Sequence, residues 1–118
     1  MLMTTYKQGD IVLVWFPDSN LLTAKKRPAI VLQADNLQTE LDQLIIGMII
    51  TNLIRKEHKS RIFVDIQMKT GQRTGLLSNS VIMTDNIATV RLSEIYKGIG
   101  TFVEMDILKE SLRHTFGI

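Results

Sequence analysis

The stretch GDIVLVWFP, residues 9–17, decides the fold class of this 118-residue chain. The pair Gly9-Asp10 is typical of a turn, and residues 11–16 after it are apolar at every position. Successive side chains of a strand point to opposite faces, so this run predicts a strand covered on both faces, as in a small closed sheet. Pro17 cannot donate a hydrogen bond to a sheet, and we expect it to end the strand.

Further apolar runs of strand length follow along the chain. Pro28 opens a second run over residues 29–32. Three more runs predict strands, over residues 44–54, 62–66 and 80–90. The polar pair Asp85-Asn86 interrupts the last of these runs, so we expect a break or a bulge there.

Polar connections separate these runs. Residues 18–26 contain Ser and Asn and predict an exposed loop, whereas residues 35–43 predict a helical turn or an irregular connection. Gly71 and Gly75 bracket a further loop. We find no internal repeat, low-complexity tract or linker, so we expect residues 1–118 to form a single domain.

The final segment changes to a helical period. Its apolar residues recur at three- and four-residue spacing, which places them on one face of a helix; they are Met105, Leu108, Leu112 and Phe116. Thr101 and Glu104 predict a capping box at the start of this helix, and Gly117 predicts its end. The expected architecture is a β-rich α+β domain of about five to seven short strands and one C-terminal helix.

The composition excludes several classes of chemistry. The chain has no cysteine, which removes disulfides, thiolate zinc sites and thiol nucleophiles, and its two histidines alone make a poor metal site. We therefore expect no metal and no cofactor. The formal charge of +2 is compatible with nucleic acid but does not require it.

Two further observations concern membranes. Residues 1–7 lack the long apolar core of a signal peptide. The longest apolar run, residues 44–50, is too short to cross a bilayer. We expect a soluble, cytoplasmic protein.

Three stretches, in this order, carry a resemblance to a known family. Residues 9–17 followed by KRPAIVL at 26–32 resemble a GDIV…F-P strand that leads through a loop into an R-P strand. IITN at 49–52 resembles a third strand ending in Thr or Ser, and TGL at 74–76 with SVIMTDNIATV at 80–90 is similar to a G-L…S-V…D-Q segment. Each motif is weak alone. Together, their order and spacing resemble the MazF/PemK family of toxins from type II toxin–antitoxin systems.

This resemblance implies an SH3-like small barrel, a homodimer, and an endoribonuclease (mRNA interferase) that cleaves single-stranded RNA with sequence selectivity and inhibits growth. It also implies a cognate antitoxin whose acidic, disordered tail lies over the RNA groove. RNA carries its own nucleophile, the 2′-hydroxyl, so such an enzyme needs no metal. It needs a proton acceptor, a proton donor and positive charge for the phosphorane, and it leaves a 2′,3′-cyclic phosphate and a 5′-hydroxyl.

Three positions match residues that the family uses in catalysis. Arg27, directly before a proline, matches the catalytic arginine, and its guanidinium suits electrostatic stabilisation of phosphate better than proton donation. Thr51, at the end of an apolar strand, can donate to a phosphate oxygen. Asp85 matches an acidic residue that some members use; it either takes the 2′-hydroxyl proton or caps a turn with Asn86.

Further positions are predicted to contact RNA. Asn52 is a candidate for a base or phosphate contact, and basic residues are predicted to form a phosphate track. These basic residues are Lys25, Lys26, Arg55, Lys56, Lys59 and Arg61. Solvated loop charge is the alternative for each of them. Trp15 and Phe16 offer a stacking face, although strand-end aromatic residues more often belong to a core.

The chain departs from the family pattern at two positions. Asn86 replaces the usual glutamine, and Ala88 stands where an arginine is common. Arg91 lies three positions on, and strand alternation places it on the opposite face, so it is a poor substitute. His58 in a charged loop and His114 on the last helix are expected to be separate surface residues.

Other functions stay open. The main alternative is a non-catalytic nucleic-acid or protein-binding barrel, including a related gyrase-poisoning toxin without a nuclease site, although Arg27 and Thr51 argue against it. Another is a toxin whose Ala88 change has cost activity. Apolar side chains in loops suit a partner surface; they are Leu21, Leu22, Leu76 and Leu77.

Overall fold

The computed structural model describes residues 6–17, 20–35 and 40–118. Parts of the N-terminal segment, of the loop predicted over 18–26 and of the connection predicted over 35–43 therefore lie outside the described residues. The described elements, in chain order, are β1 (Asp10–Pro17), β2 (Ala24–Val31), β3 (Gln43–Ile50), β4 (Arg61–Val64), α1 (Lys69–Gln72), β5 (Ser80–Arg91), the 3-10 turn η1 (Leu92–Glu94), β6 (Ile95–Thr101) and α2 (Met105–Phe116).

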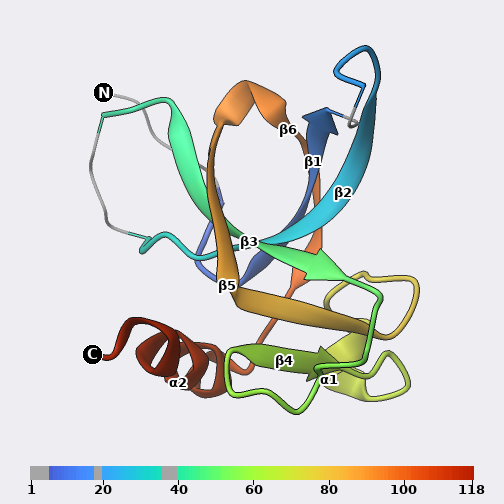
Figure 1. The fold of residues 1–118 in the computed structure, drawn as a ribbon, viewed down its shortest axis with the longest axis vertical. Helices are drawn as coiled ribbons and strands as arrows, with labels where there is room; N and C mark the ends of the chain where they lie inside the picture. The colour runs from blue at the N-terminus through green and yellow to red at the C-terminus, as the bar shows by residue number, and fades with distance from the viewer. Residues whose placement is uncertain (1–5, 18–19, 36–39) are drawn as a thin grey trace.

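The six strands form one antiparallel sheet in the order β4-β5-β3-β2-β1-β6. Strands β1, β2, β3, β5 and β6 curl around a ring in Figure 1, with β4 and α2 below it. The predicted β-rich α+β domain with a C-terminal helix is confirmed. The sheet is curled but open, because no ladder joins β4 to β6 within the described ranges.

Both faces of β1 are buried at Ile11, Val12 and Val14, as its unbroken apolar run predicts, but Trp15 near its end is 40% exposed, so one face is covered only in part. Ile11 belongs to a helix-side cluster that includes Leu108 of α2, whereas Val12 and Val14 belong to a ring cluster with Ile46 of β3. All five side chains are fully or almost fully buried. Each such burial contributes on the order of 1.5–3 kcal/mol to folding, so the two clusters together fix the curl of the sheet.

β2 begins five residues earlier than the sequence predicts, at Ala24 instead of Ala29. Its outer half pairs with the end of β1, where Trp15 lies opposite Lys26 and Pro17 lies opposite Ala24. The basic residues 25–27 therefore lie on a strand and not in a loop. The prediction was wrong because hairpin pairing with an apolar partner strand outweighs the polar character of these residues.

β3 and β5 bend at the predicted interruption. Gly47 pairs with Ile87, but the next residue, Met48, pairs with Met83. Three residues of β5, Thr84 to Asn86, therefore have no partner in this ladder, and Figure 1 shows β5 turning sharply below the ring. The predicted bulge at Asp85-Asn86 is confirmed, although β3 itself ends at Ile50 and not at residue 54.

Three elements were not predicted, namely α1, the turn η1 and β6. The four-residue helix α1 begins at Lys69 and ends at Gln72, just inside the stretch between Gly71 and Gly75 that was expected to be a loop, and β6 covers the glycine-containing segment 95–101. A side chain at Gly100 would place its Cβ 2.4 Å from the Thr74 carbonyl oxygen, so this crossing requires glycine. The close approach holds the segment after α1 against β6.

The last helix lies where the helical spacing of its apolar residues predicts it, but the residues at its N-terminus do not form the predicted cap. Thr101 is the final residue of β6, and the N-cap position is Glu104, whose side chain makes no capping hydrogen bond. The predicted capping box is therefore wrong. Gly117 ends the helix in a left-handed conformation with φ of 68°, as predicted. Leu108 is fully buried, whereas Phe116 is largely exposed.

Candidate functional site

Arg27 lies on the outer half of β2, opposite Val14 of β1. Alternation along the strand places its side chain on the face of Ala29, which is the face of the ring cluster. Arg27 is exposed, and no carboxylate pairs with it in the part of the chain that the structure describes. A strand thus fixes the backbone of an arginine whose guanidinium is available to an external anion.

Thr51 lies at the same end of the β2–β3 ladder as Arg27. The last pair of that ladder joins Ala29 to Met48, so Arg27 is two residues beyond it on β2 and Thr51 is three residues beyond it on β3. The ladder itself stops at Ala29 and Met48, so no strand pairing joins Arg27 to Ile50 or Thr51 in the described ranges. The two residues that match the family's catalytic pair therefore lie beyond the same end of this ladder, and both are exposed.

The segment after Thr51 forms a loop over residues 51–60 that leads into β4. Asn52 uses its side-chain oxygen locally, because Oδ1 accepts a hydrogen bond from the Ile54 N–H at 3.0 Å. Its amide NH₂ group is left for an outside partner. Arg55 is exposed, whereas Lys56 folds back so that its Nζ lies 4.6 Å from the centroid of the Phe63 ring.

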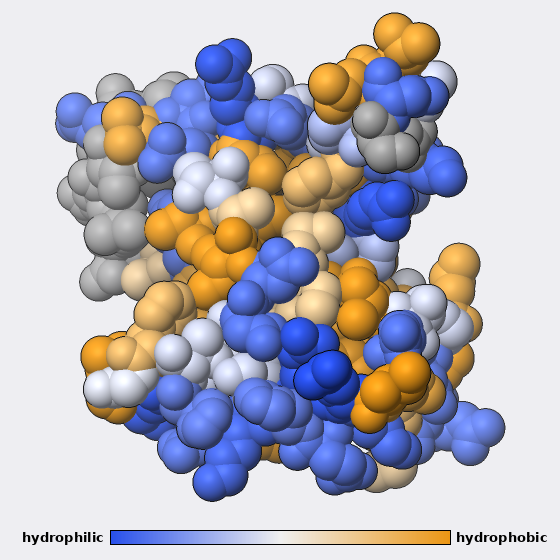
Figure 2. Space-filling view, viewed as in Figure 1, coloured by the Kyte–Doolittle hydropathy of each residue, from blue (hydrophilic) through white to orange (hydrophobic). Residues whose placement is uncertain are grey.

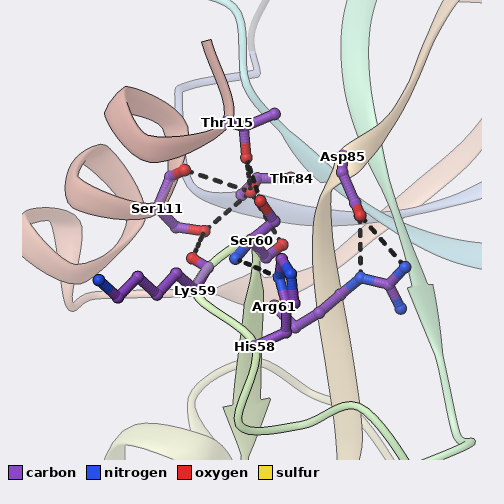
Figure 3. Close-up of polar contacts among 8 residues, drawn as sticks. All are labelled: His58, Lys59, Ser60, Arg61, Thr84, Asp85, Ser111 and Thr115. Carbon is purple, nitrogen blue, oxygen red and sulfur yellow. Dashed lines mark hydrogen bonds and ion pairs between the residues drawn. The ribbon is translucent and has the colours of Figure 1, made fainter. Parts of the chain in front are cut away.

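Another predicted basic contact, Lys59, faces a different part of the molecule. Figure 3 shows its side chain pointing away from Asp85, on the side of α2. Lys59 lines a groove of about 1060 Å³ between β4 and α2, together with Arg61 and His114. The predicted phosphate track is thus divided between the outer half of β2, the 51–60 loop and this groove.

Asp85 forms an ion pair with Arg61. Arg61 Nε donates to Oδ1 at 2.9 Å and Nη2 donates to Oδ2 at 3.2 Å, so both carboxylate oxygens are engaged (Figure 3). The bulge that carries Asp85 lies opposite Gly47 and Met48, which is about 10 Å along β3 from Thr51 at the usual strand rise. Asp85 is thus engaged by Arg61 and lies away from the end of β3 that Thr51 follows.

The neighbouring bulge residue, Thr84, ties β5 to the last helix. Its side chain is fully buried, and its Oγ1 lies 2.9 Å from the Ser60 carbonyl, 2.8 Å from Ser111 Oγ and 2.9 Å from Thr115 Oγ1. Ser111 Oγ in turn donates to the Lys59 carbonyl at 2.9 Å. This hydroxyl network, drawn in Figure 3, fixes the bulge and so the position of Asp85.

The two histidines are adjacent, contrary to the prediction that they are separate. The ring centroids of His58 and His114 lie 6.1 Å apart with an interplanar angle of 68°. His58 Nδ1 accepts a hydrogen bond from the Ser60 N–H at 3.1 Å, which leaves its Nε2 as the donor nitrogen of the neutral ring. Sequence spacing could not show this pair, because only the packing of α2 against β4 and β5 creates it.

The departures from the family pattern have simple structural consequences. Ala88 packs into the ring cluster opposite Ile46, while Arg91 is exposed and lies opposite Gln43. Ala88 and the buried Val90 share a face, so Arg91 points away from it, as predicted. Figure 2 shows apolar side chains gathered over the ring, with hydrophilic ones around them. Nothing on this inner face of β5 replaces the family arginine.

Four loop leucines were predicted to suit a partner surface. Leu21, Leu22 and Leu77 are strongly exposed, at 78%, 87% and 96% of their surface. Leu76 instead packs against the helix-side cluster. Three of the four leucines therefore remain available to a partner.

The described ranges contain no metal-binding cluster of side chains and no helix that could cross a membrane. No group of three or more His, Cys, Asp or Glu side chains lies together there in a way that could hold a metal ion. None of the helices described has the length and apolar character needed to cross a membrane.

Several solved structures share this fold. The chain is similar to the Mycobacterium tuberculosis toxin MazF-mt6, with a TM-score of 0.70 and 19% identity over 92% of this chain and 97% of that one. It is also similar to a mycobacterial endoribonuclease solved in complex with its cognate antitoxin (TM-score 0.70, 13% identity, 97% of each chain). The MazE–MazF complex of Deinococcus radiodurans matches with a TM-score of 0.70 and 15% identity over 98% of this chain and 99% of that one.

Sequence comparisons give the family. No curated protein matches the chain. Residues 7–115, nearly its whole length, match the family model of the PemK-like, MazF-like toxin of type II toxin–antitoxin systems. The chain therefore belongs to the family of PemK-like, MazF-like toxins of type II toxin–antitoxin systems.

Proposed function

We propose that this toxin is an endoribonuclease that cleaves single-stranded mRNA by attack of a 2′-hydroxyl on the adjacent phosphate, without a metal ion. The observation that carries this proposal is Arg27: it is exposed and has no carboxylate partner in the described ranges, at the end of the ladder where Thr51 also lies. Two of the similar solved structures are named endoribonucleases, which supports the same reaction class.

In this mechanism Arg27 binds the non-bridging phosphate oxygens and stabilises the charge that the phosphorane adds. The Thr51 hydroxyl donates to a phosphate oxygen and orients it. A bond forms from the 2′-oxygen to phosphorus as the 2′-hydroxyl loses its proton and the bond to the 5′-oxygen breaks. The departing 5′-oxygen takes a proton from solvent water, so the products are a 2′,3′-cyclic phosphate and a 5′-hydroxyl.

Asp85 is our candidate for the group that accepts the 2′-hydroxyl proton. Its ion pair with Arg61, and its distance along β3 from Thr51, favour an alternative in which it positions Arg61 instead. The variants Asp85→Asn and Arg61→Ala separate these roles. A base role predicts loss of cleavage in Asp85→Asn alone, whereas a positioning role predicts similar losses in both variants.

RNA binding and partners complete the proposal. Lys25, Lys26 and Arg55 are exposed and suit phosphate contacts, the exposed Asn52 suits a base or phosphate contact, and Lys56 and Lys59 are further candidates. We propose a homodimer and a cognate antitoxin with an acidic, disordered tail as partners. The complexes of similar toxins with their antitoxins support the second of these.

The deciding experiment incubates the purified protein with single-stranded RNAs of varied sequence in EDTA. We expect cleavage with cyclic phosphate and 5′-hydroxyl ends, and a loss of about 100-fold or more in Arg27→Ala. Arg91→Ala is the matched control, an exposed arginine that faces away from the ring, and should keep its activity. RNA that stays intact across all sequences contradicts the proposal, and so does an Arg27→Ala variant that cleaves at the normal rate.

A further inference from the structure

An exposed pair of aromatic residues lies on the far face of the β1–β2 hairpin from Arg27. Trp15 of β1 is 40% exposed and Tyr96 of β6 is 50% exposed. Trp15 lies opposite Lys26, and Tyr96 lies where the β1–β6 register shifts, between Ile95 and Lys97. The three residues Trp15, Lys26 and Tyr96 form what we call the aromatic corner.

In the aromatic corner the two rings meet edge to face, and the Lys26 ammonium group lies over both of them. The ring centroids of Trp15 and Tyr96 are 6.1 Å apart and the ring planes meet at 77°. Lys26 Nζ lies 4.1 Å from the Tyr96 centroid and 5.3 Å from the Trp15 centroid. A second ammonium, that of Lys97, lies 5.7 Å from the Tyr96 ring. Ring surface and positive charge are therefore presented together.

The aromatic corner is not part of either core. Phe16, the neighbour of Trp15, turns to the other face and packs against the ring cluster, whereas Trp15 points outward. Neither Lys26 nor Lys97 has a carboxylate partner in the described ranges. The corner thus lacks the apolar cover and the ion pairs that a purely structural cluster would show.

These properties select the kind of ligand. Pairs of aromatic side chains can also bind quaternary ammonium groups, but the two lysine ammonium groups of this site would repel such a ligand. A flat ring attached to an anion fits both parts, because the ring stacks on Trp15 or Tyr96 while the lysines contact the anion. An unpaired nucleobase with its phosphate has this combination.

We propose that the aromatic corner stacks one unpaired base of a single-stranded RNA, next to the phosphate held by Arg27. This rests on the proposed function. Lys26 and Arg27 are consecutive residues on opposite faces of β2, and the β3 ladder begins only at Ala29. An RNA strand that crosses this unpaired edge of β2 can therefore contact both faces of the β1–β2 hairpin. On binding, Lys26 leaves the rings and contacts the phosphate of the stacked nucleotide.

The test uses the fact that Trp15 is the chain's single tryptophan. A fully 2′-deoxy oligonucleotide of mixed sequence, which lacks the attacking hydroxyl, is titrated while tryptophan fluorescence is recorded. We expect quenching, and about tenfold weaker binding in Tyr96→Ala, with Tyr96→Phe close to the parent protein. Phe116→Ala, an exposed aromatic residue on α2, is the matched control and should bind normally.

An abasic oligonucleotide of the same length separates stacking from charge. It keeps the phosphates but has no bases, so binding without quenching is the expected result. The proposal is overturned if the normal oligonucleotide causes no quenching, if Tyr96→Ala binds equally well, or if an acidic peptide quenches where the oligonucleotide does not. Cleavage of all-ribose RNA is measured on the same samples. Cleavage without quenching overturns only the aromatic corner, and quenching without cleavage overturns only the nuclease.

Discussion

The buried hydroxyl of Thr84 offers the sharpest test of how the bulge is held. We expect Thr84→Val, which keeps the shape of the side chain, to lower the free energy of unfolding by about 2 kcal/mol. A hydroxyl donates once and accepts up to twice, and each buried hydrogen bond contributes about 1 kcal/mol net. The loss is limited because two hydrogen bonds remain in the variant. The Ser60 carbonyl still accepts from the Thr84 N–H at 2.9 Å, and Ser111 Oγ still donates to the Lys59 carbonyl.

Urea unfolding followed by far-ultraviolet circular dichroism measures this loss. For 118 residues the unfolding entropy is roughly 250 cal/mol/K, so 2 kcal/mol corresponds to a fall of about 8 °C in Tm. Thr89→Val is the matched control, since Thr89 is an exposed threonine on the same strand and should change stability by less than about 0.5 kcal/mol. If the two variants are equally stable, the hydroxyl network does not hold the bulge as we argue.

Three further perturbations test other parts of the fold, each by urea unfolding. Arg61→Ala and Asp85→Ala in a double-mutant cycle should give a coupling of about 1 kcal/mol that shrinks in 1 M salt; a coupling that resists salt contradicts a partly exposed ion pair. Gly75→Ala should destabilise by about 2 kcal/mol or more, because φ is +74° and the new Cβ would lie 2.1 Å from the Ile99 carbonyl oxygen. An unchanged urea midpoint would show that the backbone at Gly75 does not contact Ile99. Leu108→Ala should cost about 2–5 kcal/mol, and a loss under 1 kcal/mol would mean that α2 is not docked as described.

The parts of the fold that the sequence predicts are those with a local cause. The unbroken apolar run of β1 requires cover on both faces, the polar pair in β5 breaks its ladder, and Gly117 ends the last helix. β6 escaped prediction because Gly98 and Gly100 interrupt its apolar alternation, and their role appears only where another backbone crosses. The outer half of β2 escaped because charged residues can form a strand when a partner strand is available.

The candidate site divides in the same way. Arg27 and Thr51 could be located from the resemblance to the family, Arg27 directly before a proline and Thr51 directly after an apolar run. The β2–β3 register then shows that both lie beyond the same end of that ladder. The contact between His58 and His114 depends on residues 56 positions apart meeting across the α2 interface, which no local pattern encodes. Tyr96 was missed for the related reason that its strand was missed.

The free edge of β2 has a consequence for handling the protein. Residues 24–28 pair with β1 on one side, and their other backbone groups form an open strand edge, which is a template for strands of other molecules. Lys25, Lys26 and Arg27 place positive charge along that edge and so oppose self-association and aggregation. Variants that neutralise these residues should therefore be less soluble whether or not they bind RNA. Their colloidal stability must be measured before any lost activity is assigned to chemistry.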